Sequence, residues 1–495
     1  MDLLSAQHLN NVYANTKFGM SPDEVAMSDL YGLTEEDITK ALATSGSVSG
    51  GTDGSSLIGE SLDPVVKVIT MQAENFTPLL RRFYTFQAKA VTEQFTRLKS
   101  LGISGSSWRG EGNLGVQDSI ELERVTQSVR FLGQTGAVTR GMQLAAQAKF
   151  GDVKALQALG RLNKLLLDLE REMIWANSTL NTLAFQGLLQ QMDAGATYNI
   201  NKAATGVAGA RITYTGGGSI AASDLRGNAE AFLVTDGMPT ACYLAPADKY
   251  AISSEQDNNV RWYKEDQQSR VAYGMVVDQI QTDFGWVDLV WDMWLRNYRG
   301  KLLPTPEDPT DTTKFHAEAP AVLAVAPTGA AAAGSYLPVN TYYYGVALVN
   351  ESGEGPIKLQ SSGYTTDNTN GKINVTVTLP ADVSNIRSLR LYRSTTNGTN
   401  YLLQRLVKEV ALTGVGGGTQ VIADDGAIIP GSRTALMLNE KMMALGLLES
   451  PNMRDLADID NTFRFTISAM AVAMVYNTKN LLRWHNIGGS VTDPA

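Results

Sequence analysis

A run of apolar residues at helical spacing, between residues 152 and 190, most constrains how this chain can fold. Its members recur at alternating intervals of three and four residues: Leu159, Leu162, Leu166, Leu169, Met173, Ala176, Leu180 and Leu183. This spacing, without an interior proline, predicts one continuous helix over 152–190, about 50 Å long at ~1.5 Å per residue. A coiled-coil dimer is the alternative, but few of the charged residues that a zipper uses flank the apolar stripe.

A second long element is expected near the C-terminal end of the sequence. Apolar residues alternate with other residues over 463–475, which predicts a strand of about 14 residues, roughly 45 Å long. Its face of small residues, among them Ala469, Ala471 and Ala473, can lie flat against the helix. The residues just before it, 434–450, are expected to form another helix.

Residues 85–139 are predicted to form a long, mostly polar hairpin. Two flanks of strand composition enclose a tip rich in glycine and serine. Charges at Glu93, Arg97, Arg124 and Arg130 fall where a buried face should be apolar. A two-stranded ribbon is at best marginally stable in water, so the hairpin should need a partner outside its own domain.

The first 62 residues are expected to form an acidic arm rather than a domain. They contain nine acidic residues and two lysines, which give this segment a net charge of −7. Helix N-cap patterns begin at Ser21 and Thr34, and residues 45–56 have the composition of a flexible linker. A further helix is predicted over 63–76.

The second half of the chain divides into two blocks. Residues 205–317 mix short strands with helical pieces at 223–230 and 245–253, which indicates an α+β unit that ends in a proline-rich linker. Seven short candidate strands then follow within 318–434, with turn signals about every ten residues. This spacing is typical of an all-β sandwich.

The composition excludes several classes of protein and fits a β-rich globular protein as well as one whose surface meets other proteins. Hydrophobic residues make up 43% and charged residues 18%, the net charge is −9, and no basic stripe is present to neutralise phosphates. Cys242 is the only cysteine, which excludes an intramolecular disulfide and a thiolate zinc site. No secretion signal is evident, and the longest apolar stretch, 467–476, is far short of the ~20 residues that span a bilayer.

No motif for chemistry emerges. The histidines His8, His316 and His485 are scattered, and neither a nucleophile motif nor a phosphate-binding loop occurs. The acidic cluster within 454–460 is interpreted as a solvated turn, with a divalent cation site as the alternative. Cys242 is expected to be an inert residue in a buried strand. We therefore expect no catalytic, cofactor-binding or metal-binding residue.

The order of these parts resembles the major capsid proteins of tailed bacteriophages, with their Hong Kong 97 capsid fold. The residues that carry the resemblance are the hairpin at 85–139, the helix at 152–190 and the segment 449–487, with its connector, long strand and Asn-x-Lys turn. In the terms of that family, the arm is 1–62, the E-loop is 85–139, the peripheral domain comprises 63–84 and 140–204, the axial domain with its linker is 205–317, and the chain returns to both domains at 435–495.

The resemblance implies an α+β capsid protein without enzymatic activity. Many copies would form hexamers and pentamers and close an icosahedral virion shell around double-stranded DNA, without sequence-specific binding and without a membrane. Cement, portal and scaffolding proteins would be its other partners, and the chain would be made in the cytoplasm of a bacterial host.

The block 318–434 departs from the minimal family pattern. It resembles an immunoglobulin-like or fibronectin-like sandwich, in particular over 342–356 and 389–395, and is interpreted as a domain inserted into the capsid fold and displayed outside the shell. Two alternatives remain at this point. One is another virion component, such as a tail or baseplate protein; the other is a bacterial surface protein with a fibronectin-like accessory domain.

Overall fold

The computed structural model describes much of the chain after the N-terminal arm. The described residues run from 73 to 488, with gaps at 103–107, 109–110, 113–118, 151, 195–210, 214–217, 230–237, 260–276, 284, 296–320, 331–336, 338, 351–352, 361–362, 367–371, 395–404, 425, 427, 458–460 and 479–480. The predictions for the arm and for most of the helix at 63–76 lie outside these residues, as does most of the proline-rich linker.

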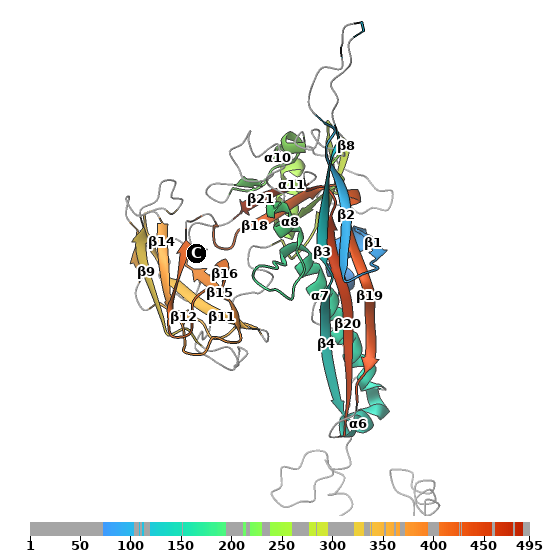
Figure 1. Ribbon diagram of the computed structural model, residues 1–495, viewed down its shortest axis with the longest axis vertical. Helices are drawn as coiled ribbons and strands as arrows, with labels where there is room; N and C mark the ends of the chain where they lie inside the picture. Colours follow the sequence, from blue (N-terminus) through green and yellow to red (C-terminus); the bar gives the residue numbers. More distant parts are fainter. Residues whose placement is uncertain are drawn as a thin grey trace, which may run out of the picture. The chain divides into compact units, whose positions relative to one another are not determined.

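A long four-stranded sheet and one helix form the body that carries the hairpin (Figure 1). The strands, in sheet order, are β1 (Tyr84–Gln87), β19 (Met443–Asp455), β20 (Thr462–Val475) and β4 (Arg130–Thr139). β20 has 14 residues, which confirms the predicted long C-terminal strand. One face of this sheet packs against helix α7 (Val153–Trp175) through a buried cluster of Leu165, Phe465, Ile467 and Ala469.

The prediction of one continuous helix over 152–190 is wrong. α7 begins after Asp152, whose side chain accepts the Lys154 N–H, and ends after 23 residues, about 35 Å. Beyond it, the side chains of Asn177 and Asn181 accept the N–H groups of the residues two positions ahead, at 2.9 and 3.1 Å. These local turns compete with helical hydrogen bonds, so helix resumes only at α8 (Leu188–Ala194).

The predicted apolar stripe of α7 is confirmed at Leu169 and Met173, which are buried, but nearer the start of the helix it passes through Leu165 instead of Leu166. Leu165 is 1% exposed and faces the sheet, whereas Leu159 is 57% exposed and Leu166 is only partly buried. The sequence has three consecutive leucines at 165–167, so a spacing pattern alone admits either Leu165 or Leu166 as the inward residue. Leu165 is the inward residue because its side chain packs against Phe465, Ile467 and Ala469 of β20.

The hairpin is shorter than the predicted 85–139. It consists of β2 (Thr92–Ser100) and β3 (Glu121–Ser128), which pair only with each other. The outer flanks are β1 and β4, and these belong to the four-stranded sheet. The change of partner occurs at Val129, which is buried and donates its N–H to the Val91 carbonyl at 2.8 Å.

A six-stranded mixed sheet forms the predicted α+β unit. Its strands, in sheet order, are β5 (Arg211–Thr213), β21 (Leu481–Ile487), β18 (Arg433–Leu438), β6 (Ala241–Leu244), β8 (Gly285–Trp291) and β7 (Gln279–Thr282). The two predicted helical pieces are confirmed as α10 (Ala222–Asn228) and α11 (Pro246–Asn259). Cys242 is buried in β6, as predicted.

The helix predicted over 434–450 is wrong. This stretch contains β18, a single 3₁₀ turn η4 (Glu440–Met442) and the first part of β19. β18 is a central strand, and its residues Ala435 to Leu438 are all fully buried. A strand buried on both faces reads as a continuous apolar run, which periodicity cannot distinguish from a buried helix.

The strand-rich block contains two main antiparallel sheets that share one hydrophobic cluster. The first is β12 (Lys358–Leu359), β11 (Tyr344–Asn350), β15 (Ile386–Arg393) and β16 (Arg405–Ala411); the second is β17 (Thr419–Asp424), β14 (Lys372–Thr378) and β9 (Ala324–Ala330). The cluster draws on β11 and β15 from one sheet and on β14 and β17 from the other. Arg393 and Tyr344 also reach Asp424 across the sheets, at 2.5 and 2.9 Å.

No helix among the described residues is long and apolar enough to cross a membrane.

Candidate assembly surface

The inner side of the β2–β3 hairpin is anchored on the body of the protein. The Phe95 ring meets the Tyr476 ring edge-on, with ring centroids 5.1 Å apart. On the same side, Arg97 lies directly opposite Glu123 and forms a cross-strand ion pair at 2.7 Å. The charges that made the hairpin look polar are therefore partly paired within it, and its base has contacts with its own chain.

The outer side of the hairpin is different, because it exposes apolar side chains. Leu98 and Leu122 are direct cross-strand partners and are 51% and 61% exposed. Leu101, Ile120 and Trp108, which lie nearer the tip in the sequence, are also exposed, at 83%, 57% and 93%. An exposed apolar patch on a ribbon without its own core is typical of a protein–protein contact surface.

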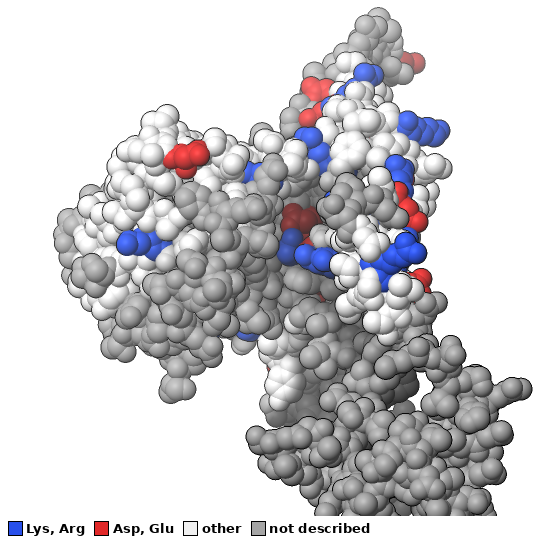
Figure 2. All heavy atoms as spheres, turned by 90° about the horizontal axis from the view of Figure 1, so that it is seen from below, with Lys and Arg blue, Asp and Glu red and all other residues white. Residues whose placement is uncertain are grey.

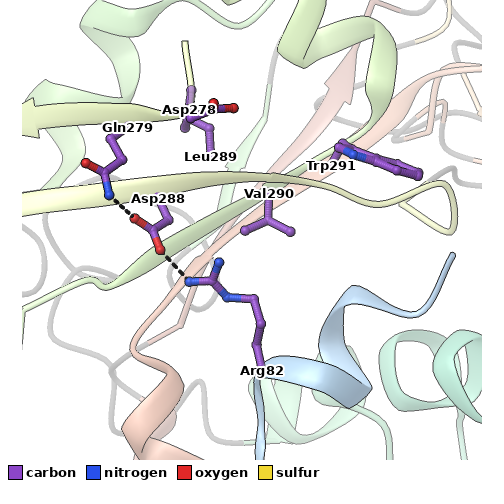
Figure 3. A pocket seen from close by; sticks show the side chains of 7 residues that line it. All are labelled: Arg82, Asp278, Gln279, Asp288, Leu289, Val290 and Trp291. Atoms are coloured by element: carbon purple, nitrogen blue, oxygen red, sulfur yellow. Dashed lines mark hydrogen bonds and ion pairs between the residues drawn. The ribbon is translucent and has the colours of Figure 1, made fainter. Parts of the chain in front are cut away.

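A pocket of about 500 Å³ lies beside the β7–β8 edge of the six-stranded sheet (Figure 3). It is lined by Arg82 from helix α5 (Pro78–Arg82) and by Asp278, Gln279, Asp288, Leu289, Val290 and Trp291 from β7, β8 and the residue before β7. Arg82 Nη2 donates to Asp288 Oδ2 at 2.5 Å, and Gln279 Nε2 donates to Asp288 Oδ1 at 2.9 Å. Arg82 Nε also donates to Glu440 Oε1 at 2.5 Å.

These hydrogen bonds fix the charges around the pocket. The hydrogen bond from Arg82 holds the pKa of Asp288 below its usual range, so Asp288 is a carboxylate at neutral pH. The hydrogen bond to Glu440 raises the pKa of Arg82 above its usual value. Arg82 and its carboxylate partners stay charged at neutral pH and hold α5 against the strands. Groups that stay charged are poor general acids or bases at this pH.

Two buried carboxyl groups lie deeper, beneath helix α5. Glu170 of α7 accepts the N–H groups of Leu79 and Leu80 at 2.7 and 2.9 Å, which satisfies the first turn of that helix. Asp292 accepts the Trp294 N–H at 2.8 Å, while its Oδ2 has no hydrogen-bond partner among the described residues. Burial, and then repulsion from Asp292, raises the pKa of Glu170; burial raises the pKa of Asp292 to about 7.

The residues considered for chemistry do not come together. Asp455 ends β19 and forms an ion pair with Lys154 at 2.8 Å, while Asp458 and Asp460 lie outside the described residues. His485 is buried in β21, and the other two histidines are not described. Within the described part of the chain, no group of three or more His, Cys, Asp or Glu residues could hold a metal ion.

Charge is mixed on the face shown in Figure 2. Among the atoms that carry a colour there, basic and acidic side chains alternate, without one continuous field of a single sign. On the coloured part of this face, a neighbouring protein could pair with charges of either sign.

The fold and its exposed hairpin define a class of protein. A long helix on a long four-stranded sheet, a two-stranded hairpin and an α+β unit are the parts that the resemblance to the Hong Kong 97 capsid fold predicts. The chain belongs to the SU10 major capsid protein family, whose model matches residues 43–312, more than half of the 495 residues. It is a major capsid protein of a phage virion and forms the shell.

Comparison with solved structures finds similar folds at low sequence identity. The capsid of a native GTA particle is 9% identical, with 89% of this chain and 99% of that chain covered and a TM-score of 0.44. The capsid of the cyanophage P-SCSP1u is 12% identical (92% and 98% covered, TM-score 0.43), and the protein of Mycobacterium phage Adephagia is 10% identical (91% and 100%, 0.42). No curated protein matches. The assignment rests on the family model.

Proposed function

We propose that copies of this chain assemble as hexamers and pentamers into a closed icosahedral shell around double-stranded DNA. The observation that carries this proposal is the apolar outer side of the hairpin, where Leu98 and Leu122 lie exposed on a ribbon without a core. Burying such a pair against a neighbouring subunit contributes about 1.5–3 kcal/mol for each fully buried leucine. A closed shell repeats this contact at every subunit.

The role is structural rather than catalytic, and the DNA is held by enclosure. The net charge of −9 and the mixed surface charge support a container that does not bind tightly to its contents. Family membership supports the same role. Cement, portal and scaffolding proteins are further partners that a shell of this class would use.

A double substitution in the hairpin tests the assembly proposal. Leu98→Asp with Leu122→Asp should give folded subunits that do not form shells, because the apolar contact becomes charged. The matched control is Gln94→Asp with Thr126→Asp, another exposed cross-strand pair on the same side of the hairpin, which should still assemble. Electron microscopy and sedimentation report the outcome. Normal shells from the leucine double variant would contradict the proposal.

We further propose that residues 318–434 form an inserted immunoglobulin-like domain on the outside of the shell. Two sheets with their own hydrophobic cluster support an independent module. Before the block stands the proline-rich linker, and after it Arg433 begins β18 in the six-stranded sheet. For the remaining domain boundaries we keep those given by the resemblance to the capsid family, except that the hairpin consists only of β2 and β3. An outer position avoids competition with packaged DNA for volume.

Deletion in the full chain tests this second proposal. Replacing residues 321–431 by a short Gly/Ser loop should leave shell formation intact and reduce the outer diameter of the particle. The control is a Gly/Ser insertion of the same length after residue 320, which keeps the block in place. A deletion variant that forms no shells, while the insertion control forms them, would show that the block belongs to the capsid core.

A further inference from the structure

Strand β4 forms one margin of the four-stranded sheet (Figure 1), and no strand among the described residues pairs with its outer edge. Arg140 donates its N–H to the Asn461 carbonyl at 3.0 Å, and this bond continues the register between β4 and β20. In an antiparallel ladder every second residue faces the partner strand. The N–H and C=O groups of Phe131, Gly133, Thr135 and Ala137 therefore point away from β20.

This edge lacks the devices that normally protect an edge strand. β4 has ten residues, about 33 Å, contains no proline, and has a single charged residue, Arg130, at its start. Its outward-facing residues are exposed, with Phe131 at 63%. Natural proteins usually blunt such an edge with charges, proline, bulges or a covering segment, because it is a template for strand addition.

The opposite margin of the same sheet is protected. β1 covers β19 only as far as Leu447, and the uncovered part of β19 contains Pro451 together with Glu449, Arg454 and Asp455. The register between β19 and β20 also shifts twice in this part. One margin therefore carries proline, charges and irregular pairing, whereas the other carries none of these along nine of its ten residues.

The other long edge strands that the structure describes are protected as well. β2 and β3 contain several charged residues, β9 contains Pro327, and β16 contains Arg405, Lys408 and Glu409. The edge of β17 is covered by Lys408, whose Nζ donates to the Ala423 carbonyl at 3.2 Å. Among the long edge strands that the structure describes, β4 is therefore the exception, and its unprotected edge is suited to strand addition.

We propose that the free edge of β4 binds an extended segment of a second copy of this chain, which adds a fifth strand to the sheet through main-chain hydrogen bonds. The inference rests on the shell-forming role, since copies of the same chain are the neighbours in a shell. Charge supports a second copy. Arg130 and Arg464 are the only charged residues of β4 and β20, while the chain as a whole has a net charge of −9.

Amide hydrogen exchange at single-residue resolution tests the added strand. In unassembled subunits, the amides of Phe131, Thr135 and Ala137 should exchange fast, while those of Leu132 and Gln134, bonded to β20, are protected. In assembled shells, the outward-facing amides should slow at least about tenfold. Protection of alternate residues distinguishes main-chain pairing from general burial of the sheet. Fast exchange of the outward-facing amides in shells would overturn the proposal.

A proline substitution provides the second test. Thr135→Pro removes an N–H that makes no bond to β20, a position where an edge strand tolerates proline. The variant should keep the melting temperature of the subunit, while the concentration needed for assembly rises about fivefold or more. The matched control is Met453→Pro on the protected margin. Leu456 donates its N–H to the Arg464 carbonyl, so in this register the main-chain groups of Met453 point away from β20. It should assemble like the unmodified protein.

If Thr135→Pro assembles at the same protein concentration as the unmodified protein, the proposal is overturned. If that variant does not fold, the exchange pattern decides alone. If the unmodified chain itself forms no particles, the shell-forming role fails, and this result is distinct from a failure of the edge contact.

The identity of the added strand is tested by cross-linking. A photoreactive phenylalanine analogue at Phe131 should form cross-links in shells that contain both ordinary and nitrogen-15-labelled subunits. Cross-linked peptide pairs with mixed labels support a second copy. Pairs that carry one label only would place the strand in the same chain, and cross-links to another protein would identify a different partner. Either of these results would overturn the proposal.

Discussion

Leu165 is the residue through which the packing of α7 on the sheet can be tested most sharply. Its side chain is 1% exposed and lies in a small cluster with Phe465, Ile467 and Ala469. Leu165→Ala removes three buried carbon atoms and leaves a cavity between a helix and a sheet that can collapse only partly. The expected loss in the free energy of unfolding is about 3 kcal/mol.

Leu159→Ala is the matched control, because it is the same substitution on the same helix at a residue that is 57% exposed. Its expected effect is within about 0.5 kcal/mol. Denaturant titrations of unassembled subunits, followed by tryptophan fluorescence, measure both, since Trp175 at the end of α7 and Trp294 are joined by a hydrogen bond from the Trp175 indole N–H. Equal losses for the two variants would contradict the packing of Leu165 between the helix and the sheet.

Two further predictions follow from close contacts and buried charge. Gly136→Val should destabilise the subunit by about 1–3 kcal/mol, because a Cβ at this position would lie 2.3 Å from Cζ of Phe465; an unchanged melting temperature would contradict this packing. Because Glu170 and Asp292 have raised pKa values in the folded state, the folded protein binds more protons than the unfolded chain between about pH 4 and 7. Stability should fall as pH rises through this window, Asp292→Asn should reduce that fall, and an unchanged slope in the variant would show that Asp292 titrates normally.

Much of the fold could be predicted from patterns that depend on local sequence. The alternation over 463–475 gave the 14-residue β20, and the helical pieces near 223–230 and 245–253 correspond to α10 and α11. These patterns reflect which side chains face a core, and a periodic segment of this kind carries that information in its own residues.

The errors arose where tertiary contacts decide between local alternatives. The apolar run over 435–438 forms a central strand because it lies between β21 and β6, which its own sequence does not show. Helix α7 stops where two asparagines form local turns, although the apolar spacing continues to Leu183. Likewise, the composition of β4 predicts a strand of the hairpin, because it does not reveal that β20 is its partner.

The assembly surface was predictable only in part. The charges at 93, 97 and 124 indicated a ribbon that needs a partner, but the contact surface is the apolar pair of Leu98 and Leu122. Their alignment depends on the register between β2 and β3, and a hairpin with a long tip does not fix that register by its turn. The bare edge of β4 depends on sheet order, so sequence alone could not show it.

Electron cryo-microscopy of particles assembled from the purified 495-residue chain tests the central claim most directly. The account predicts closed shells built from fivefold and sixfold rings of subunits, with each hairpin lying against a neighbouring subunit. Tubes, isolated rings or small discrete oligomers at every protein concentration would contradict it.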